Sequence, residues 1–232
     1  MVYLPQVHAT PTPLALDGIG NDTPCQVNCI AQLLTTTKSY DVIMVIVESW
    51  STNDTITAIV DSNGLNFIPR VAFGANGELW EYYARATSPL KSDNITVVFG
   101  AATTAALQVL AIHGANTRSI FDANPSIPST ESCPGVVCGA CEVLTAGACV
   151  AFIQTTTIDF VIASTVIDDP LCGPGYPNAI VLGFTNILYS SRFEVDYAIT
   201  SMPRSNVVFS CNGTHAMEIV LDAISFNGPF GS

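Results

Sequence analysis

Charged residues are scarce in this sequence of 232 residues. Asp, Glu, Lys and Arg make up only 11% of the chain, and seven Lys plus Arg stand against nineteen Asp plus Glu, which gives a formal charge of −12. An acidic chain of this kind repels phosphate backbones and anionic lipid surfaces. The composition therefore argues against nucleic acid as a partner and against electrostatic attachment to a membrane.

Long apolar runs are missing as well. The longest uninterrupted run, Val42 to Val47, has the length of a strand, whereas a membrane-spanning helix needs about 18 apolar residues. We therefore expect no membrane span. The first residues also lack the basic and extended apolar stretches of a signal peptide, so no export signal is visible in the sequence.

The sequence contains neither HExxH nor G-x-S-x-G, the signatures of common zinc and serine hydrolases. Its three histidines, His8, His113 and His215, are scattered, and we interpret them as structural or solvated. A remote Ser-His-Asp set stays open at this point. With no catalytic motif and no paired histidines in view, we expect that the protein is not an enzyme and has no cofactor.

The acidic residues near strands suggest no catalytic pair either. Asp168 and Asp169 precede Pro170 and are interpreted as a solvated turn, since no calcium-binding loop accompanies them. Glu48, Glu81 and Asp159 flank strands, but no pattern pairs them as the acid and base of a glycosidase.

Cysteine, in contrast, is plentiful, and close-set cysteines form either disulfides or thiolate ligands. The spacing C-x4-C-x2-C of Cys133, Cys138 and Cys141 is that of plant-type [2Fe-2S] ferredoxins, with Cys172 as a distant fourth ligand. An iron-sulfur or zinc site on these four residues, and with it a redox protein, is one alternative.

Disulfides are the other alternative, and we favour them because they use all eight cysteines. One even arrangement pairs 25 with 29, 133 with 138, 141 with 149 and 172 with 211, although eight cysteines allow 105 connectivities. The expected disulfide residues are Cys25, Cys29, Cys133, Cys138, Cys141, Cys149, Cys172 and Cys211. Disulfides persist in oxidising compartments, so this interpretation predicts an extracellular protein.

The secondary-structure pattern is β throughout. Short β-branched or aromatic segments alternate with turn residues, and no long amphipathic helix is convincing. The expected strands are 41–48, 56–60, 79–83, 95–99, 107–112, 158–162, 179–184, 193–199, 207–210 and 216–221. This series predicts an all-β protein, an antiparallel β-sandwich of immunoglobulin-like or jelly-roll-like type.

Two of these strands carry more specific expectations. Val42 to Val47 is apolar at every position, which predicts a central strand covered on both faces. Trp80 and Tyr82 share one face of their strand, and Leu79, Glu81 and Tyr83 share the other. We expect this aromatic stripe to be core, with a sugar-binding face at Trp80 as the alternative.

The N-terminal residues form an apolar segment interrupted by prolines at positions 5, 11 and 13, which favour an extended chain. We expect residues 1–16 to be an extended tail and residues 17–232 to be a single β-sandwich domain. The tail is either disordered, folded back on its own sheet, or a donor strand that completes a neighbour's sheet. In that last case the polymerisation residues are Val2, Leu4, Val7, Leu14 and Leu16.

Four sequons mark possible N-glycosylation sites, at Asn21, Asn53, Asn94 and Asn212. Each would need an exposed position in a secreted glycoprotein. Asn21 is the weakest candidate because Pro24 follows its Thr23.

From about Leu14 to Ile224, the order of segments resembles a β-sandwich module of about 200 residues found in archaeal and environmental-bacterial cell-surface proteins. The matching segments are short turn and strand signals: Leu16–Gly18, Leu34–Thr37, Asp41–Ile43, Val60–Leu65, Leu79–Ala84, Ser92–Val97, His113–Asn116, Phe121–Asp122, Asp159–Ile162, Glu194–Val195 and Ala216–Ala223. The resemblance implies a sandwich architecture and an exported setting, and it carries no catalytic residues.

These observations together predict a structural protein: the subunit of an extracellular, pilus-like filament or cell-surface assembly that polymerises with itself by donor-strand complementation. The resemblance is to archaeal fibres built in this way. A carbohydrate-binding or adhesion module of the cell surface, with glycans as partners, and the metal-binding redox protein are the alternatives.

Overall fold

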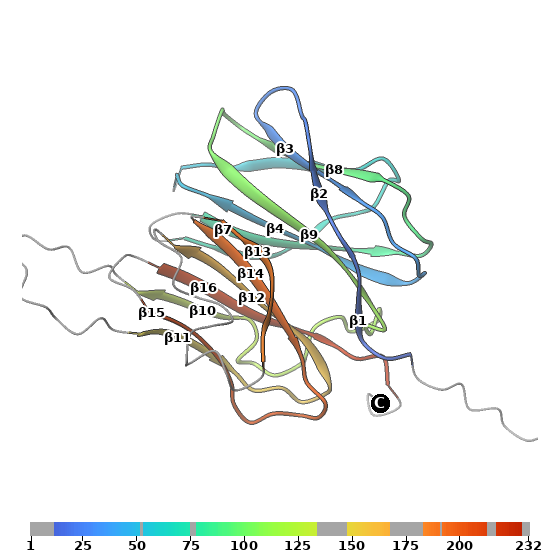
Figure 1. Cartoon of the computed structure of the whole chain (residues 1–232), viewed down its shortest axis with the longest axis vertical. Coiled ribbons are helices and arrows are strands. Elements are labelled where there is room, and N and C mark those ends of the chain that lie inside the picture. Colours follow the sequence, from blue (N-terminus) through green and yellow to red (C-terminus); the bar gives the residue numbers. More distant parts are fainter. Residues whose placement is uncertain are drawn as a thin grey trace, which may run out of the picture.

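The structure is a computed structural model of the whole chain, and it describes residues 12–51, 53–74, 78–133, 148–167, 183–190, 192–212 and 217–228. Figure 1 shows the chain as strands joined by loops. Within the described ranges we find strands but no helix, and so none that could cross a membrane. The all-β prediction is confirmed.

Sixteen strands are formed by the described residues. Their bounds are β1 Ala15–Ile19, β2 Asn21–Thr23, β3 Cys29–Leu34, β4 Asp41–Ser49, β5 Ile56–Val60, β6 Ile68–Phe73, β7 Glu78–Ala86, β8 Asp93–Phe99, β9 Ala105–His113, β10 Ser129–Cys133, β11 Ala148–Ile153, β12 Asp159–Ile167, β13 Thr185–Tyr189, β14 Phe193–Ile199, β15 Val207–Asn212 and β16 Met217–Ser225.

The strands form four antiparallel sheets that stack as four layers (Figure 1). The outer N-terminal sheet has the order β2-β3-β8-β5, and the inner N-terminal sheet has the order β1-β9-β4-β7-β6. The inner C-terminal sheet follows with the order β10-β16-β12-β14-β13, and the outer C-terminal sheet contains β11 and β15. The antiparallel β-sandwich is thus present twice: β1–β9 build one sandwich and β10–β16 build the other.

Strand β4 lies at the centre of the inner N-terminal sheet, between β7 and β9. All nine of its residues are buried. Val42, Met44 and Ile46 pack toward the C-terminal sandwich, whereas Ile43, Val45 and Val47 pack toward the outer N-terminal sheet. The prediction of a central strand covered on both faces is confirmed, and the reason is that a second sandwich covers the face that would otherwise meet water.

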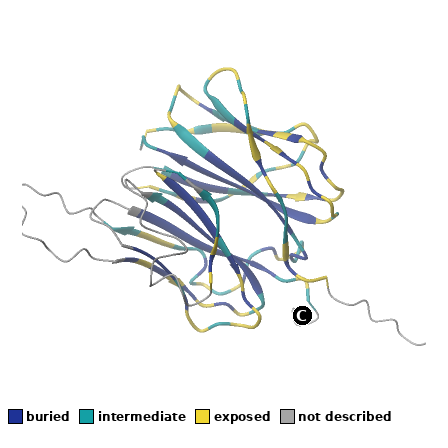
Figure 2. Cartoon of the chain, viewed as in Figure 1, coloured by how far each residue is buried: buried dark blue, intermediate teal, exposed yellow. Residues whose placement is uncertain are grey.

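The two sandwiches share one core between their inner sheets. Met44 and Leu110 on the N-terminal side join Phe160, Ile162 and Val220 on the C-terminal side in a single apolar cluster. Figure 2 shows the consequence, because the buried strands run through the middle layers of the molecule while exposed residues gather on the outer strands and loops. The expected single sandwich over 17–232 is therefore, in detail, two sandwiches joined face to face.

Nine of the ten expected strands are present, most of them longer at one end or both. The tenth, 179–184, is misplaced: residues 179–182 lie outside the described residues, Phe184 is not in a strand, and β13 begins at Thr185. Strands β1, β2, β3, β6, β10 and β11 were not expected. Each has only three to six residues, and most of them mix apolar with polar side chains, so periodicity gives them little signal.

Strand β1 corrects the expected boundary of the N-terminal tail. Ala15–Ile19 pairs with β9 of the same chain, and Leu14 is 7% exposed in the core shared by the two sandwiches, where Leu16 packs against it. Leu14 and Leu16 therefore pack in the chain's own core, and the interpretation of these two residues as polymerisation residues is wrong. The fold begins by Leu14.

Candidate functional site

Two disulfides are formed between described cysteines. Cys25 pairs with Cys29, as expected, and closes the turn that leads into β3. Cys133 pairs with Cys149 across a Cα–Cα distance of 5.6 Å, so the arrangement that paired Cys133 with Cys138 and Cys141 with Cys149 is wrong. This bridge joins the end of β10 to β11, and so ties the inner C-terminal sheet to the outer one.

Cys211 on β15 is also disulfide-bonded. Its partner lies outside the described residues, as do Cys138, Cys141 and Cys172. The disulfide at Cys133 bears on the iron-sulfur or zinc alternative, because a bridged sulfur is not a thiolate and cannot bind a metal as one. The proposed four-cysteine ligand set therefore loses Cys133.

The four sheets have eight edges in the described residues, and six of them carry features that oppose pairing with another chain. Bulges interrupt β1, β5, β6 and β13. Strand β2 is only three residues long and contains Asp22, and β10 exposes Glu131. Bulges, charges and short edges are the usual protection against edge-to-edge aggregation.

The outer C-terminal sheet differs, because neither of its two edges has such protection from any described residue. Strands β11 and β15 pair in unbroken register over six residue pairs, from Ala148 opposite Asn212 to Ile153 opposite Val207. Neither strand contains a charged residue, a proline or a bulge. Within the described residues, each pairs only with the other. This sheet is consequently the part of the described fold best suited to accept an added strand.

The two faces of this sheet are unlike each other. Toward the inner C-terminal sheet it presents a fully buried set, with Ile153, Val207 and Phe209 each 0% exposed. On the other side Val150 is 39% exposed and Phe152 is 57% exposed. An added strand of alternating apolar residues would thus extend the buried face of the sheet, and its outer side would lie beside an apolar surface.

The donor residues Val2, Leu4 and Val7 lie outside the described residues. The segment from Val2 to Val7 has six residues, the same length as β11 and β15. The described chain starts at Thr12, which is exposed.

A polar cluster lies between the two inner sheets. Arg70 on β6 donates two hydrogen bonds to Asp222 on β16, at 2.8 Å and 2.9 Å, and its guanidinium lies 3.8 Å from the ring centroid of Phe121. Ser164 on β12 donates to Glu81 on β7 at 2.8 Å. Burial, and then the charge of Asp222, raise the pKa of Glu81. The raised pKa favours the protonated form of Glu81, and the cluster links one sandwich to the other.

A second carboxyl pair is buried within the inner C-terminal sheet. Glu194 and Asp196 on β14 are both 0% exposed, and the amide of Asn186 on β13 donates to each, at 3.2 Å and 3.3 Å. Burial first, and then the neighbouring Asp196, raise the pKa of Glu194. Two carboxyls this close do not both ionise readily, so the pair holds a proton near neutral pH.

Glu48, Glu81 and Asp159 have separate surroundings and do not form an acid and base pair. Burial raises the pKa of Glu48 to about 7 against the opposing charge of Arg192. Burial, and then the charge of Asp122, raise the pKa of Asp159 to about 7. These carboxyls contribute to the pH dependence of stability. Asp168 and Asp169 lie outside the described residues.

The aromatic stripe of β7 is core, as expected. Trp80 is 7% exposed and packs with Tyr82 in the N-terminal sandwich, whereas Leu79 and Tyr83 pack on the opposite face against the C-terminal sandwich. A buried Trp80 offers no stacking surface to a sugar, so the alternative of a Trp80 sugar-binding face is wrong.

The sequons and histidines are distributed as follows. Asn21, Asn53 and Asn94 are exposed, Asn21 and Asn94 on strands and Asn53 in a loop. The side chain of Asn212 lies outside the described part of the structure, and so do His8 and His215. His113 is hydrogen-bonded to Asp41, an interaction that spacing along the sequence did not reveal.

Comparison of the chain with models of protein families, with curated proteins and with solved structures finds no match. The resemblance to cell-surface sandwich modules therefore stays a prediction.

Sequence reasoning missed β11, one of the two unprotected strands. The run Ala148–Ile153 is apolar except for its cysteine and has strand length, so a signal was present. Because Cys149 stands next to the close-set cysteines, the sequence interpretation treats it as a disulfide residue and not as part of a strand.

Proposed function

We propose that this protein is the structural subunit of an extracellular filament or cell-surface assembly, joined by strand addition between copies. The observation that carries the proposal is the outer C-terminal sheet, whose two edges are regular, uncharged and unprotected as far as the described residues go. In strand addition, main-chain hydrogen bonds supply affinity and alternate side chains supply specificity. The disulfides support an oxidising, extracellular setting.

The donor in this proposal is the segment around Val2, Leu4 and Val7 of a second copy. It matches the acceptor in length, and Val2 and Leu4 alternate as the buried face of a strand requires. Leu14 and Leu16 take no part, since they pack in the chain's own core. The donor segment is thus confined to residues 1–11.

The test is deletion of residues 1–11, which leaves β1 and the core intact. We expect native material to form filaments in negative-stain microscopy and the deletion variant to remain monomeric. A synthetic peptide of residues 1–11 should bind the deletion variant and protect amides of β11 or β15 from hydrogen exchange. The same peptide with Leu4→Asp is the matched control and should not bind.

Two results would contradict the proposal. Long polymers that persist without residues 1–11 would eliminate the donor strand. Amide protection confined to the inner or outer N-terminal sheet would eliminate β11 and β15 as the acceptor.

A further inference from the structure

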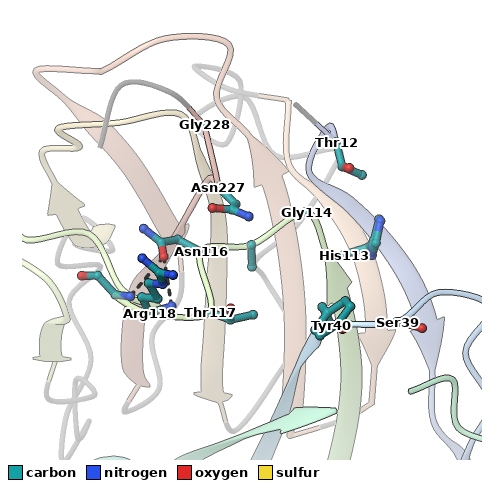
Figure 3. Close-up of a pocket in the computed structure, with 12 residues that line it drawn as sticks. Thr12, Ser39, Tyr40, His113, Gly114, Asn116, Thr117, Arg118, Asn227 and Gly228 are labelled. Atoms are coloured by element: carbon teal, nitrogen blue, oxygen red, sulfur yellow. Dashed lines mark hydrogen bonds between the residues drawn. The ribbon is translucent and has the colours of Figure 1, made fainter. Parts of the chain in front are cut away.

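A polar pocket of about 580 Å³ opens at the end of β9, where the segment 114–128 leaves the N-terminal sandwich for the C-terminal one (Figure 3). Parts of the chain that are distant in sequence line it: Thr12 before β1, Tyr40 before β4, His113 at the end of β9, and Asn227 after β16. Its volume lies in the usual range of small-molecule sites, about 300–1,000 Å³.

The backbone around the pocket is fixed by hydrogen bonds. The N–H of Asn116 donates to the carbonyl of Ser225 at 2.8 Å, and the N–H of Asn227 donates to the carbonyl of Gly114 at 2.9 Å. Gly114 has φ +77°, and a Cβ at this position would strike the backbone of Thr12 and Pro13. The pocket is therefore preformed, which lowers the entropic cost of binding a ligand.

His113 is oriented by a buried carboxylate. Its Nδ1 lies 2.8 Å from Oδ1 of Asp41, a residue that is 0% exposed. This contact holds the imidazole ring in place and leaves Nε2 as the ring nitrogen that can bind a ligand. A carboxylate on one ring nitrogen fixes the tautomer and the orientation of the ring. His113 lines the pocket, and so offers a fixed hydrogen-bonding atom to a ligand hydroxyl.

Tyr40 presents an exposed aromatic ring beside this histidine (Figure 3). Tyr40 is 65% exposed, and its backbone has φ 64°, a conformation that residues other than glycine rarely adopt. Strained residues of this kind cluster at functional sites. A flat ring held open to solvent provides a surface on which the apolar face of a sugar ring can pack.

Asn116 and Arg118 complete the polar lining. The side-chain oxygen of Asn116 accepts from the N–H groups of Arg118 and Ser119, at 3.0 Å and 3.1 Å, which leaves its amide nitrogen as a donor. The guanidinium of Arg118 forms no ion pair within the described residues, in a chain of net charge −12. Guanidinium groups bind carboxylates in paired hydrogen bonds.

We propose that this pocket binds a saccharide that carries a carboxylate, with the sugar ring packed on Tyr40, hydroxyls bound by His113 and Asn116, and the carboxylate bound by Arg118. This site is separate from the outer C-terminal sheet. It does not rest on the proposed filament, because a monomer contains every residue that it requires.

The test is titration of the full-length protein with glucuronate oligosaccharides, monitored by calorimetry and by saturation-transfer NMR. We expect saturable binding that is stronger than binding of neutral cellobiose. Tyr40→Ala should weaken glucuronate binding about tenfold, as expected for loss of one aromatic contact. Arg118→Gln should remove the preference for glucuronate over cellobiose.

Arg85→Ala is the matched control, since it removes an exposed guanidinium elsewhere and should leave binding unchanged. Tyr40 and Arg118 are exposed, so their variants should fold, and melting curves verify this. The proposal is overturned if neither saccharide binds, if cellobiose binds as well as glucuronate, or if Tyr40→Ala binds like the parent.

Discussion

At the scale of single residues, Tyr40 combines exposure with an unfavourable backbone conformation. A left-handed conformation costs a residue with a Cβ about 1–2 kcal/mol, whereas glycine adopts it freely at an entropic cost of about 0.5–1 kcal/mol. The exposed ring contributes little packing in return. The conformation of Tyr40 therefore costs stability, and the proposed contact of its ring with a saccharide would be its contribution to function.

We predict that Tyr40→Gly raises the free energy of unfolding by up to about 1 kcal/mol. Denaturant unfolding of the parent and the variant measures this difference in free energy. Tyr40→Ala, which keeps the Cβ and so the backbone strain, is the control and should gain no stability. A loss of more than about 1 kcal/mol in the glycine variant would show that the ring supports the fold.

Arg70 is the second informative residue, because it links β6 of one sandwich to the fully buried Asp222 of the other. Removing one partner of a buried ion pair leaves an uncompensated charge and typically costs about 3–5 kcal/mol. We therefore predict that Arg70→Met lowers the free energy of unfolding by about that amount. Arg85→Met, at an exposed site on β7, should change it by less than about 0.5 kcal/mol.

The double variant Arg70→Met with Asp222→Leu distinguishes the pair from simple packing. It removes both charges, so it should recover most of the stability lost in Arg70→Met. If it is no more stable than the single variant, the loss arises from the stem of Arg70 and its contact with Phe121.

At the scale of elements, the Cys133–Cys149 bridge joins β10 to β11 and closes a loop with a sequence separation of 16. In the chain-entropy model such a loop is worth about 3 kcal/mol, against about 2 kcal/mol for the five-residue loop of Cys25–Cys29. We predict that replacing both Cys133 and Cys149 by serine lowers the unfolding free energy more than replacing both Cys25 and Cys29 does. Chemical denaturation of the two double variants measures the order, and the reverse order would contradict it.

The strands also show which parts of the fold the sequence predicts. β4, β7 and β9 were found because long apolar or aromatic runs bury one or two faces, and burial leaves a clear periodic pattern. β1 and β2 were missed because edge strands are short and half exposed, so their side chains alternate weakly.

The candidate sites were less predictable than the strands. Tyr40, His113 and Asn227 meet only because the two sandwiches and the segment between them fold together. No spacing along the chain encodes such a contact. The disulfide of Cys133 with Cys149 likewise follows from the stacking of two sheets, whereas the pairing of Cys25 with Cys29 is set by a local turn.

At the scale of the whole molecule, buried carboxyls make stability depend on pH. The folded-state pKa of Glu48 and of Asp159 is raised to about 7, and those of Glu81 and Glu194 are also raised. Between the ordinary carboxyl range and these raised values, the folded protein holds protons that the unfolded chain releases. The free energy of unfolding therefore falls as the pH rises through this window.

We predict a higher melting temperature at pH 5 than at pH 8, measured at constant ionic strength. Glu48→Gln replaces a protonated carboxyl by a neutral amide of the same shape, so its melting temperature should vary less between pH 5 and pH 7 than that of the parent. A melting temperature that rises from pH 5 to pH 8 would show that these carboxyls are ionised in the folded protein.

Thr12, the first described residue, lines the pocket that contains Tyr40 and His113. The proposed donor segment immediately precedes it in the chain. In a filament joined by that segment, each pocket would lie beside the joint between two subunits and would recur once per subunit. Linked sites bind with far greater avidity than single ones, because each binding event raises the effective concentration of the next. A pocket with weak affinity would then hold a whole filament firmly to a surface rich in acidic sugars.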